Sequence, residues 1–284
     1  MEPVLTHLLA VEWAQKPNKP TALGTPLRYS SAYGCARQMG YYATGASPTD
    51  PMDEGDAWAP GIGTLIHESA QYAISRLFTT ARFEVPSKLG GYLSGSCDAL
   101  VSTEEIRDVT GIDLGGTDVL WELKTMGEWA FDKQVGFNRK SNTVGRGIGP
   151  KPEAITQAGM NALGLEDENT RIETILMGSL CVASVSVQKA LAMGISGFER
   201  IGSEFRISRS EWEPLALAEL GRMELIGATI EHGKLPDREA YTDGGPVYLN
   251  PRGKGWQCSY CQFRSVCVAD GEGEIEVSES WSQK

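Results

Sequence analysis

The chain has 284 residues, of which 41% are hydrophobic, and its formal net charge is −11. A chain of this length can bury one sizeable core. Its negative charge argues against a protein that coats nucleic acid non-specifically, because such binding depends on neutralised phosphates. A local basic channel stays compatible with that charge. The sequence has no run of 18 apolar residues and begins without the pattern of a signal peptide. We therefore expect a soluble cytoplasmic protein without a membrane segment.

Three elements are predicted in the first half of the chain. Apolar residues recur with a 3.6-residue rhythm over 61–78, which indicates an amphipathic helix. Two short segments, 92–101 and 119–125, are rich in residues that suit a pleated sheet and are bounded by glycines or charged turns. Both are predicted to be strands.

Three further elements follow. A helix is predicted over 153–163, behind two prolines. The segment 171–188 contains a long apolar run, which predicts a buried strand that breaks near Gly178. The last predicted helix covers 211–232. The order helix, strands, helix, strand, helix predicts a mixed α/β fold.

A charged pair within an apolar strand is the first chemical signal. Side chains two residues apart on a strand share a face, so Glu122 and Lys124 should project together while Trp121 and Leu123 point the other way. Burying a carboxylate and an ammonium is unfavourable unless a metal ion or a phosphate compensates them. If the two predicted strands pair, Asp98 joins this group.

Phosphodiester hydrolysis uses such a set of residues. Two carboxylates hold Mg²⁺ or Mn²⁺, and a cation positions the attacking water or offsets the charge that develops on phosphorus. We expect Asp98 and Glu122 to be metal ligands and Lys124 to act on the water or on the transition state. The alternative is an exposed strand edge with an ordinary Glu/Lys pair, which is the commoner origin of an isolated Glu-x-Lys.

The order of the motifs resembles the RecB-like branch of the PD-(D/E)XK nucleases. That resemblance implies a restriction-endonuclease-like core, in which a mixed sheet is flanked by helices. The motifs that carry it are Gly63-Thr64-Leu65-Ile66-His67, Gly95-x-x-Asp98, Glu122-x-Lys124 and Gln157.

The same resemblance implies roles for individual residues. It makes His67 a further metal ligand, with the backbone carbonyl of Leu123 beside it, and it places Gln157 in contact with substrate or with Lys124. For His67 the alternative is a satisfied core histidine. Asn161 stands where the family has a tyrosine.

Six cysteines occur in the chain. In the expected intracellular setting they are better interpreted as thiols or metal ligands than as disulfides. Three of them form the pattern Cys258-x-x-Cys261-x5-Cys267, and thiolates at this spacing suit Zn²⁺ or an iron–sulfur cluster. Cys97 and Cys181 lie in apolar, strand-like segments and are expected to be packing residues. The candidate ligands are Cys35, Cys258, Cys261 and Cys267.

The arrangement of these cysteines, with one before the nuclease motifs and three after them, resembles that of the four-cysteine CRISPR-associated exonucleases. The resemblance implies a structural [4Fe-4S] cluster that joins the two ends of the nuclease domain. The predicted organisation is an N-terminal extension at 1–28, a nuclease domain at 29–236, a cysteine region at 237–268 and an acidic disordered tail at 269–284.

The segment 126–152 holds five basic residues against two acidic ones, together with aromatic residues. Cations and aromatic rings on a loop grip single strands by backbone attraction and base stacking, whereas the alternative is a glycine-rich surface loop with scattered charge. The predicted DNA contacts are Trp129, Lys133, Phe137, Arg139, Lys140 and Arg146.

Two other activities are excluded, because the motif that each requires is incomplete in this chain. Gly145-x-Gly147-x-Gly149 is no dinucleotide fingerprint, because Pro150 follows where a helix should begin. His67-Glu68 does not form a zinc protease motif, because Gln71 stands where the second histidine is required.

The sequence thus predicts a Mg²⁺ or Mn²⁺ dependent DNA exonuclease that acts on single-stranded ends and carries a [4Fe-4S] cluster. Two alternatives belong to other classes: a catalytically inactive DNA-binding or assembly subunit, and a zinc-stabilised interaction module. Because the chain has no helicase motif, either a partner unwinds the DNA or the substrate is already single-stranded; a helicase or a recombination or integration protein is the candidate partner.

Overall fold

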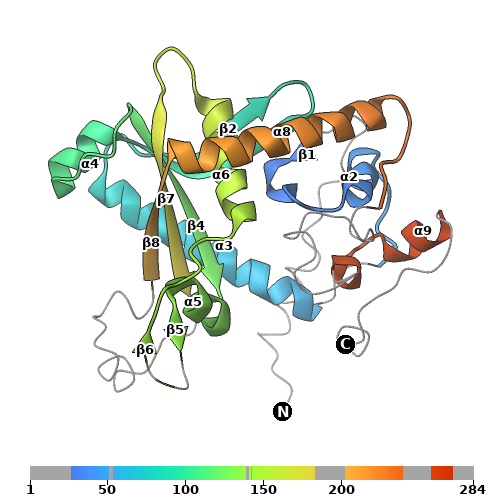
Figure 1. Cartoon of the computed structure of the whole chain (residues 1–284), viewed down its shortest axis with the longest axis horizontal. Helices are drawn as coiled ribbons and strands as arrows, with labels where there is room; N and C mark the ends of the chain where they lie inside the picture. Colours follow the sequence, from blue (N-terminus) through green and yellow to red (C-terminus); the bar gives the residue numbers. More distant parts are fainter. Residues whose placement is uncertain are drawn as a thin grey trace. The chain divides into compact units, whose positions relative to one another are not determined.

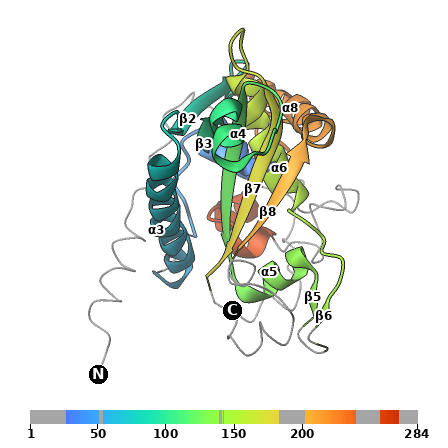
Figure 2. The same ribbon diagram turned by 90° about the vertical axis from the view of Figure 1, so that its left-hand side faces the viewer.

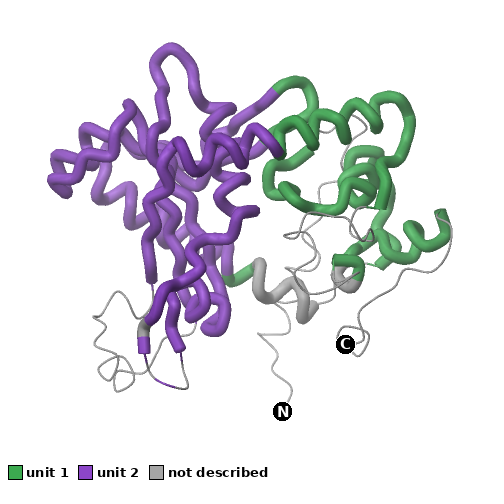
Figure 3. The backbone as a smooth tube through the Cα atoms, viewed as in Figure 1, with its two compact units in different colours: residues 1–62, 90–94, 219–284 green, residues 63–89, 95–218 purple. Residues whose placement is uncertain are grey.

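The computed structural model describes residues 27–50, 54–138, 141, 143–182, 202–238 and 257–270. The chain divides into two compact units (Figure 3): unit 1 comprises residues 1–62, 90–94 and 219–284, and unit 2 comprises residues 63–89 and 95–218. Nearly all of the predicted N-terminal extension and acidic tail lies outside the described residues. The predicted domain boundaries stay predictions.

A mixed sheet organises unit 2 (Figure 1). β3 (Leu93–Ser102) pairs antiparallel with β4 (Asp118–Met126), β4 pairs parallel with β7 (Ile172–Cys181), and β7 pairs antiparallel with β8 (Gly202–Ser208). β2 (Arg82–Leu89) also pairs with β3, and β1 (Leu27–Arg28) pairs in parallel with the first two residues of β3, in unit 1. The predicted mixed α/β fold is confirmed.

Helices flank this sheet. α6 (Pro152–Leu165) packs against β2, β4 and β7, and Figure 2 shows the sheet between α3 (Glu54–Leu77) and α6. α4 (Thr103–Thr110) follows β3, and α5 (Glu128–Val135) follows β4 and leads into a small sheet of β5 (Phe137–Asn138) and β6 (Thr143–Val144). α8 (Arg209–Glu231) follows β8. None of the helices in the described part of the chain has the length and apolar character needed to span a bilayer.

The predicted elements all occur, with one error in the long apolar strand. The predicted break near Gly178 is wrong, because β7 pairs continuously on both sides there, with Leu123 of β4 and Glu204 of β8. A Cβ atom at Gly178 would lie 3.1 Å from Cδ1 of Leu123, so close packing accounts for the glycine. The end of that apolar run, 183–187, lies outside the described residues.

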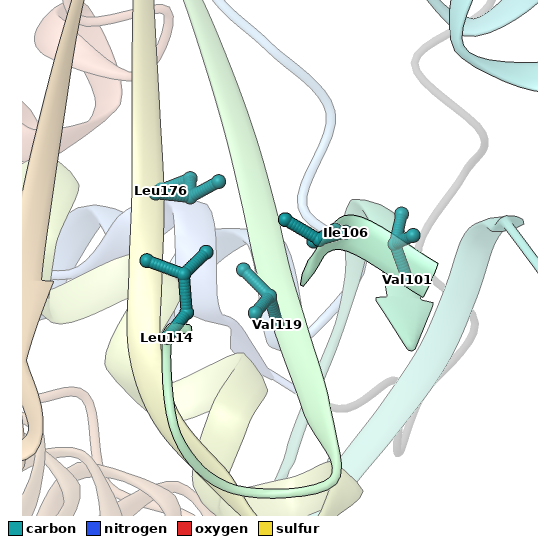
Figure 4. Close-up of a cluster of buried hydrophobic side chains, with 5 residues drawn as sticks. All are labelled: Val101, Ile106, Leu114, Val119 and Leu176. Atoms are coloured by element: carbon teal, nitrogen blue, oxygen red, sulfur yellow. The ribbon is translucent and has the colours of Figure 1, made fainter. Parts of the chain in front are cut away.

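A hydrophobic cluster covers one face of the sheet in unit 2 (Figure 4). Strands β3, β4 and β7 each supply one nearly buried side chain to it, and α4 and the loop after it supply the others. Trp121 packs against the cluster. Because side chains alternate along a strand, Glu122 and Lys124 project from the opposite face of β4, as predicted. The cluster consists of Val101, Ile106, Leu114, Val119 and Leu176.

Unit 1 brings two distant segments of the sequence together. Its short elements are η1 (Tyr29–Ser31), α2 (Ala36–Ala43), η4 (Gln257–Tyr260) and α9 (Arg264–Ala269). Tyr41 stacks on Phe263 with ring centroids 5.3 Å apart, and Tyr42 meets Phe263 edge-on at 4.8 Å. The Asp50 carboxylate accepts hydrogen bonds of 2.7 Å from both the backbone N–H and the hydroxyl of Ser265. These contacts hold α2 and the chain after it against α9.

Candidate functional site

Five of the predicted site residues converge within unit 2. Leu100 of β3 pairs with Leu120 of β4, and side chains alternate along both strands, so Asp98 and Glu122 project from the same face of the sheet. Two helices complete the group. Its members are His67 from α3, Asp98 from β3, Glu122 and Lys124 from β4, and Gln157 from α6.

Glu122 lies at the centre of this group, with its side chain 2% exposed. Its Oε1 accepts a hydrogen bond of 2.6 Å from Lys124 Nζ and one of 3.1 Å from Gln157 Nε2. Lys124 Nζ also donates to Gln157 Oε1 at 3.1 Å, which closes a triangle of three side chains. Glu122 Oε2 is buried and has no hydrogen-bond partner in the described part of the chain. One carboxylate oxygen thus lacks the interaction that a buried acceptor normally has.

Asp98 links three elements. Its Oδ2 accepts a hydrogen bond of 2.6 Å from the backbone N–H of Leu123 in β4, and its Oδ1 lies 3.3 Å from His67 Nδ1 in α3. The side chain of Leu123 is buried in the core. The Asp98 carboxylate is therefore fixed by the backbone of β4 and faces the imidazole of His67 in α3. The predicted role of the Leu123 carbonyl stays a prediction.

The electrostatics of the group follow from burial and from close opposite charges. Burial raises the pKa of Glu122; Lys124 opposes this change and Asp98 adds to it. The hydrogen bond with Asp98 raises the pKa of His67, and burial opposes that shift. A cation held between the two acids would counteract the effects of burial and of mutual repulsion.

Sequence reasoning missed two residues beside the predicted group. Gln71 Nε2 donates to the backbone carbonyl of Asp98 at 3.3 Å and to Glu84 Oε1 at 2.8 Å, while the Ser96 hydroxyl donates to Glu84 Oε2 at 3.2 Å. Glu84 has a φ of 47°, in the left-handed region that residues other than glycine seldom adopt. Gln71 lies one helical turn after His67, a spacing that could have indicated it. No sequence signal marks Glu84.

Asn161 has a structural contact of its own. It is fully buried, its Nδ2 donates to the carbonyl of Ser96 at 3.0 Å, and its backbone carbonyl accepts a 3.2 Å hydrogen bond from the Ser87 hydroxyl. The residue therefore ties α6 to β3 two positions before Asp98. An asparagine here positions the strand that carries the acid.

The four predicted cysteine ligands line a single cavity in unit 1. Cys35 immediately precedes α2, Cys258 lies in η4, and Cys267 lies in α9. Burial raises the pKa of Cys258 to about 12, and the neighbouring Cys35, Cys261 and Cys267 add to the shift. Burial likewise raises the pKa of Cys261 to about 11. The remaining two cysteines, Cys97 and Cys181, are buried in the sheet.

Within the described ranges, no group of three or more His, Cys, Asp or Glu side chains is arranged to hold a metal ion as it stands. In the polar group of unit 2 the contacts account for this. Asp98 is bonded to Leu123 and faces His67, and Glu122 is bonded to Lys124 and Gln157. An ion would have to replace some of these contacts.

The predicted DNA-binding residues are only partly brought together. Trp129 is 62% exposed on α5, and Lys133 Nζ lies 3.8 Å from the centre of its ring. Arg146 is exposed, whereas Phe137 is half-buried in β5. Phe131, an aromatic residue of the same segment, is buried in the core and cannot stack on a base. Arg139 and Lys140 lie outside the described residues.

A second hollow in unit 2 is apolar in character. A cavity of about 280 Å³ lies against the hydrophobic cluster of Figure 4 and is lined mainly by aliphatic and aromatic side chains, with Glu204 and Arg206 of β8 among the lining residues. Glu204 is the one carboxylate that lines it in the described structure. The two converging acids that we expect to hold Mg²⁺ or Mn²⁺ are found at the polar group around Glu122 and not here.

No family model matches the chain, and no curated protein matches it significantly. Among solved structures, the crystal structure of SSO0001 matches with a TM-score of 0.51 over 95% of this chain and 98% of that chain, at 15% sequence identity. A likeness at this identity concerns the fold, and it agrees with the mixed α/β architecture.

Proposed function

We propose that the chain is a Mg²⁺ or Mn²⁺ dependent deoxyribonuclease of the PD-(D/E)XK type, which degrades single-stranded DNA from its ends and carries a structural [4Fe-4S] cluster. The observation that supports this proposal best is the environment of Glu122. Its carboxylate is buried beside Asp98, with one oxygen bonded to Lys124 and Gln157 and the other without a partner in the described residues. The order of the motifs along the chain points to the same chemistry.

The chemistry of the donors fits a hard divalent cation. Mg²⁺ and Mn²⁺ prefer carboxylate oxygens, and the resemblance to the nuclease family makes the imidazole of His67 a further ligand. Asp98, Glu122 and His67 would hold the ion, and Glu122 Oε2 would gain the partner that it lacks. When bound, the ion supplies Lewis-acid activation of the scissile phosphodiester.

Lys124 acts from the edge of the site. Its side chain is 30% exposed, and its Nζ is held at 2.6 Å from Glu122 and 3.1 Å from Gln157. An ammonium fixed in this way can orient the attacking water or stabilise the negative charge on the phosphate, with little reorganisation during the reaction. Gln157 limits the directions in which the ammonium can turn.

The cysteine cavity fits an iron–sulfur cluster by its donor set. Four thiols from two distant segments line it, and burial raises the pKa of two of them, Cys258 and Cys261. Binding of a metal converts such thiols to thiolates and adds the free energy of metal binding to that of folding. A cluster held there would stabilise the packing of α2 against α9.

Single-stranded DNA is the proposed substrate because of α5. Trp129 and Lys133 lie four residues apart on this helix, so they share a face, and the ring is exposed. An exposed ring with a cation over it can stack on a base and attract the neighbouring phosphate. α5 follows β4 after Gly127, so Trp129 lies three residues after the end of β4, the strand that carries Glu122 and Lys124.

Digestion of end-labelled DNA tests the proposal. Anaerobically purified protein is incubated with Mg²⁺, Mn²⁺ or EDTA and with linear single-stranded, linear duplex or circular single-stranded DNA. Metal-dependent shortening of the linear single strand, with the circle left intact, is the expected result. Cleavage of the circle would overturn the requirement for an end, and a wild-type protein that binds DNA but cuts none of the substrates would leave a DNA-binding role in its place.

A further inference from the structure

Arginines line the cysteine cavity together with the four thiols. The side chains of Arg37 and Arg238 are half-buried, and the Nε atom of each is buried without a hydrogen-bond partner in the part of the chain that the structure describes. Arg264, which also lines the cavity, is exposed. Two of the three arginines that line the cavity therefore carry an unsatisfied Nε–H donor.

Such an arrangement is unfavourable unless an acceptor is supplied. A guanidinium is always charged and has five N–H donors and no acceptor, so every buried N–H needs a partner from elsewhere. A buried donor without one loses its hydration and gains nothing in return.

Both arginines are anchored to segments that carry a cysteine. Nη2 of Arg238 donates to the backbone carbonyl of Cys267. Arg37 lies two residues after Cys35 in α2, and its guanidinium interacts with the hydroxyl of Tyr41, which lines the same cavity. Each anchor fixes a guanidinium beside the thiols and leaves its Nε–H for another acceptor.

We infer that Arg37 and Arg238 bind the metal cluster as an anion, by donating their Nε–H groups to its sulfur atoms and by balancing its negative charge. The inference rests on the proposed cluster and is independent of nuclease activity. A cluster on four thiolates carries net negative charge, and hydrogen bonds to its sulfurs are one of the means by which a protein controls its properties. The two arginines are thus positioning residues for the cluster and not ligands.

The retention of the cluster tests this inference. Iron and acid-labile sulfide are measured in the anaerobically purified full-length protein, followed by the rate at which its brown colour is lost on addition of EDTA. Arg37→Gln and Arg238→Gln remove the charge and the Nε donor, whereas Arg37→Lys keeps the charge. Arg107→Gln, at an exposed position of α4, removes a cation outside the cavity and serves as the matched control. Circular dichroism checks that each variant is folded.

We expect each glutamine variant to lose its colour about tenfold faster than the wild type, because a hydrogen bond to a charged acceptor is worth roughly that factor or more. Arg37→Lys should be intermediate and Arg107→Gln unchanged. If the wild type holds iron and sulfide but both glutamine variants bleach at its rate, the inference is overturned while the cluster stands. Wild-type protein without iron and sulfide would overturn the cluster and the inference together. If a glutamine variant does not fold, the Arg37→Lys variant is the test. Loss of its colour at the wild-type rate would contradict the donation of a hydrogen bond by Nε of Arg37.

Discussion

The carboxylate of Asp98 accepts a hydrogen bond of 2.6 Å from the backbone N–H of Leu123. This contact fixes the acid of β3 against the residue of β4 that lies between Glu122 and Lys124. The other oxygen of Asp98 faces His67 at 3.3 Å. Asp98 therefore has two separable roles: one oxygen holds the strands in register, and the other belongs to the proposed metal site.

Replacement of Asp98 by asparagine should separate these roles. The new side chain would still offer an amide oxygen to the Leu123 N–H, but it would lack the negative charge that attracts a divalent cation. We expect Mn²⁺ to bind at least roughly tenfold more weakly, with a larger fall in cleavage, while thermal unfolding changes little. Calorimetric titration with Mn²⁺ measures the affinity. Unchanged Mn²⁺ affinity in the folded variant would remove Asp98 from the metal site.

The alanine variant of Asp98 is the structural control. It leaves the N–H of Leu123 without its acceptor, so the free energy of unfolding should fall by about 1–3 kcal/mol. Chemical denaturation of the two Asp98 variants checks this difference. Equal stability of both variants would contradict the structural role of the hydrogen bond.

Lys124→Met should uncouple metal binding from catalysis. The ammonium bonds to Glu122, so its removal leaves that carboxylate without a cation and frees it for the metal. Addition of Mn²⁺ should therefore raise the unfolding temperature of this variant more than that of the wild type, whereas cleavage falls by about 100-fold or more. Lys88→Met, at an exposed position of β2, is the matched control and should behave like the wild type. Wild-type cleavage by the folded Lys124→Met protein would exclude a catalytic role for the lysine.

The polar group was largely predictable because the geometry of a strand decides it. Alternation places Glu122 and Lys124 on one face whatever surrounds them, and the pairing of two neighbouring strands brings Asp98 to the same face. Among the residues that support the group, Glu84 could not be found in this way. Glu84 belongs to β2, whose side chains are mostly exposed or half-buried, so the strand has little apolar signal.

The error at Gly178 has the opposite origin. Glycine weakens an isolated strand, and a local rule therefore predicts a break. In the sheet the residue lies between β4 and β8, where a Cβ atom would lie 3.1 Å from Cδ1 of Leu123, so a larger residue would require Leu123 to shift. Tertiary packing decides the matter, and it is not visible in the local sequence. Tertiary packing also decides the position of Phe131. The composition of the segment 126–152 groups it with Trp129, but Phe131 is buried in the core.

The exposed face of α5 should determine affinity for single strands. In an Asp98→Asn background, which prevents digestion, Trp129→Ala should weaken binding of a single-stranded oligonucleotide by about 1–3 kcal/mol, the contribution of one stacked base. Trp129→Phe should restore most of that loss. Fluorescence anisotropy measures the affinity. Wild-type affinity in Trp129→Ala would contradict a stacking role.

Lys133 should contribute mainly through charge. Its replacement by alanine should weaken binding and reduce the slope of log affinity against log salt by about 0.7, the value for one phosphate contact on a single strand. The same titrations at several salt concentrations measure this slope. An unchanged slope would show that Lys133 does not contact a phosphate.

Glu105 gives a prediction on stability that is independent of function. Hydrogen bonds from the Thr80 hydroxyl and from the backbone N–H groups of Thr79 and Thr80 hold its pKa at about 2, below its ordinary value of 4.5. The ionised form is favoured in the folded protein, so its contribution is present above the ordinary pKa and is lost as the pH falls towards about 2. Glu105→Gln should therefore lower the unfolding temperature at about pH 6, and the difference from the wild type should shrink steadily below pH 4.5. A difference that is constant with pH would contradict this assignment.

The most direct test of the account is single-turnover cleavage of a labelled single strand by the wild type and by Glu122→Gln, each stripped of metal and then given Mn²⁺. Glutamine preserves the shape of the buried side chain and removes its charge, and Glu104→Gln, at an exposed position of α4, is the matched control. We predict that the wild type and the control cut the strand when Mn²⁺ is added and that folded Glu122→Gln does not. Cleavage by Glu122→Gln at the wild-type rate would contradict the proposed active site.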